Sequence, residues 1–314
     1  MQYRRLGRSG LQLSEIGLGS WLTYGNAVEL EEARKCFHKA FDLGINFFDT
    51  ANNYAEGDAE RCLSKILPDF PRDEYVLATK CYFPVGEKPN QSGLSRKHIR
   101  EQCDRSLQRL GVDYIDLYQC HRYDENTPLD ETLRALDDLV RAGKVLYVGG
   151  SEWPADRIVE AHRIAERLGL DRMVSNQPRY NMLARQIERT VIPMCEHLGV
   201  GQVVYSSLGQ GVLTGKYSGG EIPADSRAAD DRQNQFIKGV LTPQNIERAD
   251  KLAPVAKEAG VSPAQLAIAW CLRQANVTSA IVGASRPEQV EENAAASGVE
   301  LSDDVLKKID RIVR

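Results

Sequence analysis

The chain has 314 residues, of which 42% are hydrophobic and 27% charged, so it can build a full apolar core and is unlike a disordered or fibrous protein. Length alone allows two average domains, although a barrel of alternating strands and helices fills about 200–250 residues as one domain. The net charge of −4 argues against a nucleic-acid-binding face, which would be rich in Lys and Arg. A small molecule is the better expected partner.

The cysteines and the start of the chain indicate the compartment. The seven cysteines are odd in number and none stands in a Cys-x-x-Cys pair, so neither a disulfide framework nor a zinc knuckle is indicated. The five histidines show no metal-ligand spacing. No apolar signal core opens the chain, and no run of about 18 apolar residues occurs. We expect a cytoplasmic protein without membrane insertion or a bound metal.

Short β-rich runs alternate with longer stretches of helical period, after a hairpin-like opening that contains several glycines. Strands are expected at 16–18, 45–48, 75–79, 114–120, 145–148, 173–176, 203–205 and 280–282. Helices are expected at 29–42, 59–67, 95–110 and 129–140, after Pro154, and at 187–198. This order predicts an α/β protein, a single (β/α)8 TIM barrel domain over residues 1–314 with an N-terminal hairpin. A doubly wound open sheet is the competing architecture.

The helix expected at 95–110 has clear end signals. Ser95 can cap its N-terminus, Ile99 and Cys103 belong to one apolar stripe, and Gly111 is suited to end it. In contrast, residues 207–242, after the seventh strand, are rich in Gly, Asp, Ser and Gln and far exceed the usual connection of about two to six residues. We predict a functional lid or binding loop there; a flexible surface insertion is the alternative.

Three strand-like runs end on an ionisable residue: Asp49, Lys80 and His121. In a parallel barrel, side chains at the C-terminal ends of neighbouring strands converge on one mouth, and Tyr54 follows in the next loop. A tyrosine is a weak acid, with a pKa of about 10, but an adjacent ammonium lowers that pKa. Lys80 can be this ammonium, held in place and kept protonated by Asp49. His121 can present a neutral imidazole to a carbonyl oxygen.

Such a site donates a proton to an oxygen on which negative charge develops. Reduction of a carbonyl also requires a hydride source, which must come from a cofactor. Other chemistries find no support. Segment 17–22 lacks the third glycine of the dinucleotide fingerprint, and segment 211–216 has the wrong spacing for a phosphate loop and is followed by Tyr where Ser or Thr is required. No Gly-x-Ser-x-Gly elbow occurs.

These residues carry a family resemblance. The segment 44–54, followed by Glu60, resembles the first signature of the aldo-keto reductases, and segment 113–121 resembles the strand that delivers their histidine. By that likeness Tyr54 is the proton donor, and Asp49, Lys80 and His121 complete a catalytic tetrad. The resemblance implies reduction of small aldehydes or ketones to alcohols with NADPH. Substrate contacts are expected from Trp21, Tyr54, Tyr82, His121 and Trp153.

The resemblance extends to the cofactor. Ser151, Asn176 and Gln177 resemble the residues that hold the nicotinamide carboxamide, and Tyr205 the aromatic that stacks on the ring. The full set that we assign to the cofactor is Gly19, Ser20, Trp21, Asp49, Ser151, Asn176, Gln177, Tyr205, Ser206, Ser207, Leu208, Gly209, Gln210, Gly211, Lys216, Ser226, Arg227, Gly283, Ser285, Arg286, Gln289, Glu292 and Asn293.

Ser285 and Arg286 also support a phosphate site on physical grounds. They follow a strand and open a helix, where free backbone N–H groups and the helix dipole attract an anion. A guanidinium there can bind a 2′-phosphate with two hydrogen bonds, which favours NADPH/NADP+ over NADH. The alternative is a simple helix cap at Ser285 with a solvated arginine.

Segments 92–99, 126–129 and 265–273 resemble the voltage-gated potassium channel β-subunit group and its bacterial relatives, which implies a homo-oligomer, a tetramer or larger. Three residues depart from the family pattern: Glu152 stands where many reductases have Asn, Ser207 replaces the common Pro, and Ser64 replaces the Gly that ends the first signature. Two alternatives to a reductase stay open. One is an NADPH-binding docking or redox-sensing subunit with little turnover, and the other is a barrel isomerase or lyase without nicotinamide.

Overall fold

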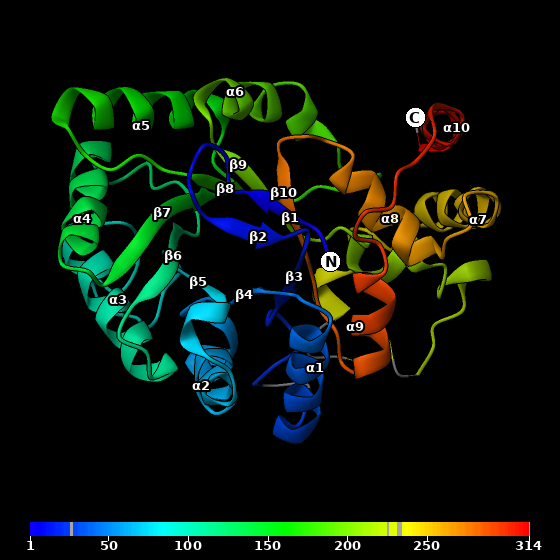
Figure 1. The fold of residues 1–314 in the computed structure, drawn as a ribbon, viewed down its shortest axis with the longest axis horizontal. Coiled ribbons are helices and arrows are strands. Elements are labelled where there is room, and N and C mark those ends of the chain that lie inside the picture. The colour runs from blue at the N-terminus through cyan, green and yellow to red at the C-terminus, as the bar shows by residue number, and fades with distance from the viewer. Residues whose placement is uncertain (26–27, 225, 231–233, 314) are drawn as a thin grey trace.

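The computed structural model describes residues 1–25, 28–224, 226–230 and 234–313. Within these ranges, eight parallel strands close into a barrel in the order β10-β3-β4-β5-β6-β7-β8-β9 (Figure 1). They are β3 (Ile16–Gly19), β4 (Phe47–Asp49), β5 (Val76–Cys81), β6 (Ile115–Cys120), β7 (Val145–Ser151), β8 (Ser175–Gln177), β9 (Gly201–Val204) and β10 (Val277–Val282). The predicted (β/α)8 barrel is confirmed, and the open sheet is excluded because β10 pairs with β3.

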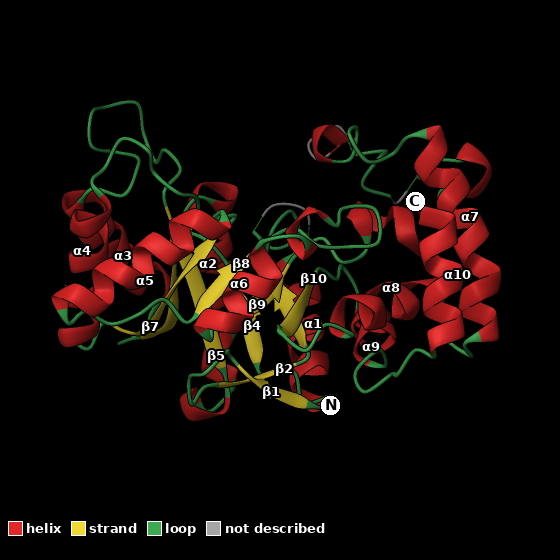
Figure 2. Cartoon of the chain, turned by 90° about the horizontal axis from the view of Figure 1, so that it is seen from above, coloured by secondary structure: helices red, strands yellow, loops and turns green. Residues whose placement is uncertain are grey.

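Helices surround the barrel. They are α1 (Leu30–Asp42), α2 (Asp58–Ser64), α3 (Arg96–Leu110), α4 (Leu129–Arg141), α5 (Ala155–Leu168), α6 (Val191–Leu198), α8 (Pro263–Leu272) and α9 (Pro287–Ala294). Two more, α7 (Pro243–Glu258) and α10 (Asp303–Val313), pack against each other at the periphery (Figures 1 and 2). None of the described helices is both long and apolar enough to cross a membrane.

Local signals explain where these helices begin and end. The Ser95 hydroxyl accepts a hydrogen bond from the backbone N–H of His98, and Gly111 ends α3 with a φ of 68°, a left-handed conformation that glycine adopts without strain. The helix expected at 187–198 begins only at Val191. The reason is Pro193, which is tolerated in the first turn of a helix but removes a hydrogen bond in the interior.

A hairpin covers the N-terminal end of the barrel. Its strands, β1 (Tyr3–Arg5) and β2 (Gln12–Ser14), pair antiparallel, and Figure 2 shows them beneath the barrel strands. Leu6 and Leu13 are fully buried in the cluster that fills the barrel interior, together with Phe47. Because one end is closed in this way, the site must lie at the other end, where the strands finish.

The connection after β9 runs over this open end. Its described residues contain three short 3-10 turns, η5 (Gly209–Thr214), η6 (Ser218–Gly220) and η7 (Asn234–Phe236), before α7 begins. Gly211 in η5 has a φ of 92°, and a Cβ there would lie 2.8 Å from Lys216 Cε. A residue with a side chain is therefore strained at this position.

Candidate active site

The four predicted catalytic residues meet at the C-terminal ends of β4, β5 and β6. Lys80 Nζ lies 2.6 Å from Asp49 Oδ1 and 3.3 Å from the Tyr54 hydroxyl, and that hydroxyl lies 3.4 Å from His121 Nε2. The phenol oxygen is thus within hydrogen-bond distance of both an amine and an imidazole. The convergence of these residues expected from the sequence is present in the structure.

Backbone strain surrounds the tyrosine. Tyr54 opens the short turn η1 (Tyr54–Gly57), in which Ala55 and Glu56 have φ angles of 47° and 54°. This left-handed region is unfavourable for residues with a Cβ, by about 1–2 kcal/mol each. Strained backbone of this kind is characteristic of functional sites, where the surrounding structure holds it in place.

Lys80 is fully buried, and burial lowers its pKa, although the charge and hydrogen bond of Asp49 oppose that shift. Its ammonium also donates to the Thr50 carbonyl oxygen at 2.7 Å. The other oxygen of Asp49 accepts hydrogen bonds from Gln177 Nε2 at 2.9 Å and Gln119 Nε2 at 3.5 Å. Each partner of this buried ion pair therefore has a second hydrogen bond, which a buried pair needs in order to be tolerated.

The pKa of Tyr54 corrects the sequence argument, which expected the ammonium to lower it. Burial raises the pKa of Tyr54 well above 10, the nearby charge of Asp49 raises it further, and only Arg122 acts in the opposite direction. The physical reason is that burial disfavours the charged phenolate, and that the Asp49 carboxylate beside Lys80 adds repulsion. The phenol therefore stays protonated across neutral pH.

The pKa of His121 is lowered well below 6.5, first by burial and then by repulsion from Lys80 and Arg122. The imidazole is therefore neutral near pH 7, as the sequence argument expected. His121 Nδ1 is buried without a hydrogen-bond partner among the described residues, whereas Nε2 faces Tyr54. The tautomer with its proton on Nε2 leaves no buried donor unpaired, so we assign that tautomer.

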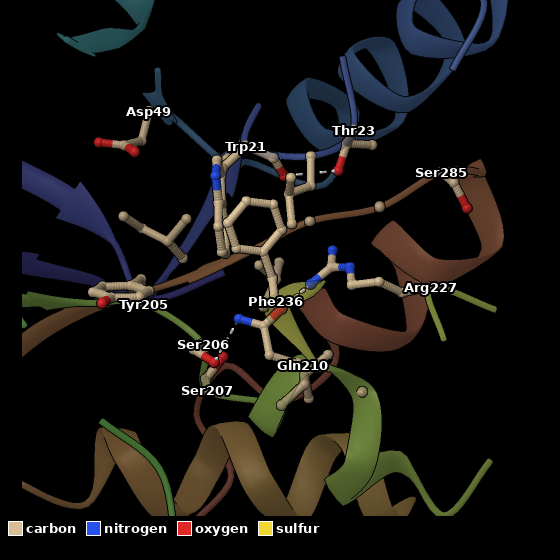
Figure 3. A pocket seen from close by; sticks show the side chains of 18 of the residues that line it. Trp21, Thr23, Asp49, Tyr205, Ser206, Ser207, Gln210, Arg227, Phe236 and Ser285 are labelled. Atoms are coloured by element: carbon tan, nitrogen blue, oxygen red, sulfur yellow. Dashed lines mark hydrogen bonds between the residues drawn. The ribbon is translucent and has the colours of Figure 1, made fainter. Parts of the chain in front are cut away.

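A large cavity of about 1160 Å³ begins at this cluster. It runs from Tyr54 and His121 to Ser285 and Arg286 at the start of α9. Figure 3 shows Asp49 at one side of the cavity and Ser285 at the other. Ligand pockets usually measure about 300–1,000 Å³, so this cavity is large enough for a dinucleotide and a small substrate.

Most residues that we assigned to the cofactor line this cavity. They are Gly19, Trp21, Asp49, Ser151, Gln177, Tyr205, Ser206, Ser207, Leu208, Gln210, Gly211, Lys216, Ser226, Arg227, Gly283, Ser285, Arg286, Gln289, Glu292 and Asn293. Three others do not. The Ser20 hydroxyl bonds to Thr50, Asn176 Oδ1 accepts from the backbone N–H of Trp153, and Gly209 lies buried in its turn.

The middle of the cavity suits a pyrophosphate. The hydroxyls of Ser207 and Ser226 are buried, line the cavity and have no hydrogen-bond partner among the described residues. Arg227 projects into the same region, where it donates to Gln210 Oε1, and its guanidinium lies 5.9 Å from the centre of the Trp21 ring (Figure 3). Two unpaired hydroxyls beside a cation match the needs of a bound anion.

The end of the cavity at α9 is lined by residues that hydrogen-bond to one another. The backbone N–H of Ser285 donates to Gln289 Oε1 at 2.8 Å, and Gln289, Glu292 and Asn293 all line the cavity from α9. A phosphate bound at this helix N-terminus would therefore compete with the Gln289 side chain for the N–H group of Ser285.

Two of the residues expected to contact the substrate do not line the cavity. Trp153 is buried edge-on against Tyr123, with ring centres 5.0 Å apart, and Tyr82 packs against Phe83 at 5.3 Å. Both rings anchor loops. Trp21, Tyr54 and His121 do line the cavity.

Sequence reasoning missed two cationic residues and one aromatic residue that line the cavity: Arg122, Arg179 and Phe236. The Phe236 ring meets Trp21 edge-on at 5.2 Å (Figure 3). Arg122 directly follows His121, so its place at a strand end was a usable signal. The other two lie in irregular segments, for which no periodicity exists.

Glu152 occupies an unusual position next to this site. Its φ is 57°, and its Oε1 accepts the backbone N–H of Arg179 at 2.7 Å. Burial, followed by the charge and hydrogen bond of Glu152, raises the pKa of Tyr205. The carboxylate thus contacts the Tyr205 hydroxyl and the Arg179 backbone.

Comparison with known proteins agrees with this geometry. Residues 15–314 match the model of the aldo/keto reductase family. The chain belongs to the aldo/keto reductase family. Members are oxidoreductases that act on small molecules and generally use NAD(P)H, which disfavours the isomerase or lyase alternative.

Individual relatives of this aldo/keto reductase carry two kinds of name. This chain is 42% identical to an Oryza sativa subsp. japonica protein named "Probable voltage-gated potassium channel subunit beta", with 100% of this chain and 97% of that protein covered. An Arabidopsis thaliana protein of the same name is also 42% identical, with the same coverage. The "L-glyceraldehyde 3-phosphate reductase" of Escherichia coli (strain K12) is 39% identical, with 99% of this chain and 92% of that protein covered.

Proposed function

We propose that this oxidoreductase is an NADPH-dependent reductase of small aldehydes or ketones in which Tyr54 donates the proton. The contact of the Tyr54 hydroxyl with both Lys80 and His121, at one end of a cavity of dinucleotide size, carries the proposal. We also propose that residues 1–314 act as one barrel domain in the cytoplasm.

The cofactor would lie along the cavity. Tyr205 would stack on the nicotinamide, Ser207 and Ser226 would hold the pyrophosphate, and Arg286 would select the 2′-phosphate of NADPH. Ser151 and Gln177 are proposed at the carboxamide, although their side chains also make internal hydrogen bonds, from Ser151 Oγ to the Gln177 carbonyl oxygen and from Gln177 Nε2 to Asp49. When bound, the reduced nicotinamide would supply a hydride to the carbonyl carbon.

The protein's own residues would manage the proton. The Tyr54 phenol is protonated at neutral pH and can give its proton to the carbonyl oxygen. An alkoxide is far more basic than a phenolate, so this transfer is downhill even with a raised tyrosine pKa. Lys80 would stabilise the resulting phenolate, and the Nε2–H group of His121 would orient the carbonyl oxygen.

The test is the loss of NADPH absorbance with a panel of small aldehydes and ketones, L-glyceraldehyde 3-phosphate among them. We expect turnover with at least some of them, typically at about 1–1,000 per second. Wild-type protein that binds NADPH but reduces none of the panel would contradict the proposal.

A second candidate is an NADPH-binding docking or redox-sensing subunit with little turnover. The names of the rice and Arabidopsis relatives favour it. The same panel separates the two, because a docking subunit binds NADPH while its turnover stays near zero. The tetramer or larger ring that we propose from this likeness can be checked by light scattering on the eluting protein.

A further inference from the structure

Arg122 stands at the part of the cavity where a substrate carbonyl would approach Tyr54. It lines the cavity beside His121, and its charge influences the pKa values of Tyr54, Lys80 and His121. The guanidinium is half-buried and lies over the Phe83 ring, with 5.2 Å from Cζ to the ring centre. The guanidinium is therefore oriented by a rigid aromatic neighbour.

The guanidinium uses only part of its hydrogen-bonding capacity. Nη1 donates to the His121 carbonyl oxygen at 2.5 Å and to Ser151 Oγ at 3.5 Å. Within the described part of the chain, Nε and Nη2 have no acceptor and no carboxylate lies within 4.0 Å of Arg122. Arg72, by contrast, pairs with Asp116. A guanidinium edge that faces a cavity without an acceptor can pair with an anionic ligand.

Apart from Asp49, the charged side chains that line this end of the cavity are positive. Arg179 lines the same cavity, and its side chain makes no ion pair among the residues that the structure describes. Asp49 is committed to Lys80, and the Glu152 carboxylate accepts the backbone N–H of Arg179. The other described acidic residues of the cavity, Asp230 and Glu292, come from the long connection and from α9.

We propose that Arg122 is a specificity-determining residue that binds an anionic group of the substrate, so that the preferred substrates are small aldehydes carrying a phosphate or carboxylate close to the carbonyl. The Nε and Nη2 atoms form one edge of the planar guanidinium, the geometry that receives two oxygens of one oxyanion. This inference rests on the proposed reductase function. The reaction is unchanged: hydride reaches the carbonyl carbon, a proton reaches its oxygen, and the anionic group stays intact.

Matched pairs of aldehydes provide the test. The pairs are glyceraldehyde 3-phosphate with glyceraldehyde, for a phosphate, and succinic semialdehyde with butanal, for a carboxylate. We expect the charged member of at least one pair to have a kcat/KM higher by about ten- to a hundredfold, the usual effect of a charge-assisted hydrogen bond. The pair that shows the preference identifies the anionic group.

Three variants assign the preference to the guanidinium. In Arg122→Met the ratio of kcat/KM values within the preferred pair should fall towards one, and Arg122→Lys should keep part of it, because an ammonium lacks the paired donors. Arg157→Met is the control: it removes the same charge from a neighbouring arginine, which lies on Tyr123 and does not line the cavity. Its ratio should equal that of the wild type. The use of ratios cancels any effect of Arg122 on the acidity of Tyr54.

Binding separates this inference from the reductase proposal. Calorimetric titrations with glycerol 3-phosphate and with 4-hydroxybutyrate, the product of succinic semialdehyde, are carried out in the presence of NADP+. At least one of these anions should bind about tenfold or more tightly to wild type than to Arg122→Met, with no such difference for glycerol. That result would support the anion site even in a protein without turnover. An unchanged ratio in Arg122→Met, or equal binding of both anions to the two proteins, would overturn it.

Discussion

The Lys80 ammonium makes three hydrogen bonds with different consequences. Those to Asp49 and the Thr50 carbonyl oxygen satisfy a buried charge, whereas the 3.3 Å contact with Tyr54 is the one that bears on chemistry. Stability and activity therefore depend on the same side chain. We expect Lys80→Met to lower kcat by about a hundred- to ten-thousandfold and to destabilise the protein by about 3–5 kcal/mol, because Asp49 loses its cation. Aldehyde turnover and urea unfolding measure the two effects.

The double variant Asp49→Asn with Lys80→Met separates these roles. It removes both charges, so most of the lost stability should return. Activity should not return, because nothing stabilises the Tyr54 phenolate. Full recovery of turnover in the double variant would show that Lys80 acts only on stability.

His121 couples folding to pH. The pKa of His121 in the folded protein lies well below 6.5. As the pH falls below about 6.5, the imidazole therefore binds a proton in the unfolded chain but not in the folded protein. This protonation stabilises the unfolded state relative to the folded state. The free energy of unfolding should therefore drop by about 1.4 kcal/mol for each unit of pH because of this residue. His162, whose pKa burial also lowers, adds a drop of the same sign.

Urea unfolding between about pH 7 and pH 5 tests this linkage. His121→Gln should reduce the slope of the free energy of unfolding against pH by about 1.4 kcal/mol per pH unit, the contribution of one proton. Parallel stability profiles for the variant and the wild type would mean that the imidazole is protonated equally in both states.

Among the elements, α2 and β5 are joined by one buried carboxylate. Glu60 is fully buried; its Oε1 accepts the Thr79 hydroxyl at 2.6 Å and its Oε2 meets Arg109 Nε at 2.6 Å. Thr79 precedes Lys80 on β5, so Glu60 helps to fix the strand that presents the ammonium. We expect Glu60→Gln to cost about 3–5 kcal/mol in chemical denaturation, because Arg109 loses its charged partner.

A matched control lies on the same helix. Asp58 pairs with Arg61 at 2.8 Å on the surface, where both side chains are more than half exposed. Asp58→Asn should cost less than about 1 kcal/mol. A similar loss from both variants would show that burial does not govern these pairs.

Element order and the strand-end residues could be predicted from the sequence, because periodicity and chemical type are local properties. Asp49, Lys80 and His121 each follow an apolar run, and Ser95 and Gly111 carry their own end signals. The direction of the Tyr54 pKa could not be predicted in this way. It depends on how deeply the phenol is buried and on how far Asp49 neutralises Lys80, and both are properties of the assembled site.

At the scale of the whole molecule, the hairpin that closes the barrel lies at the opposite end from the cavity, so its contribution to stability is separate from function. Leu13 is fully buried in the interior cluster at the hairpin end, whereas the cavity opens beyond the strand C-termini. Leu13→Ala should lower the free energy of unfolding by about 2–5 kcal/mol through the cavity it leaves. At temperatures where the variant is folded, its kcat/KM should stay within about twofold of the wild-type value.

Leu11→Ala, at the same end of the barrel, is the control for Leu13→Ala. Because the Leu11 side chain is only partly buried, its removal should lower the free energy of unfolding by less. A Leu13→Ala variant that is stable but inactive would contradict the separation of the two ends. Closure of the barrel could be inferred from the count and order of the strands. The pairing of β10 with β3 has no local signal, because it joins residues 264 positions apart, such as Ile16 and Ala280. For the same reason the position of Phe236 over Trp21 had no local signal.

The central claim is that the Tyr54 hydroxyl delivers the proton to a carbonyl oxygen beside bound NADPH. The most direct measurement compares wild type with Tyr54→Phe, which removes one oxygen atom and keeps the ring. NADPH affinity, followed by fluorescence, should be nearly unchanged, while reduction of the best aldehyde should fall by at least about a hundredfold. A Tyr54→Phe protein that reduces the aldehyde at the wild-type rate would contradict the account.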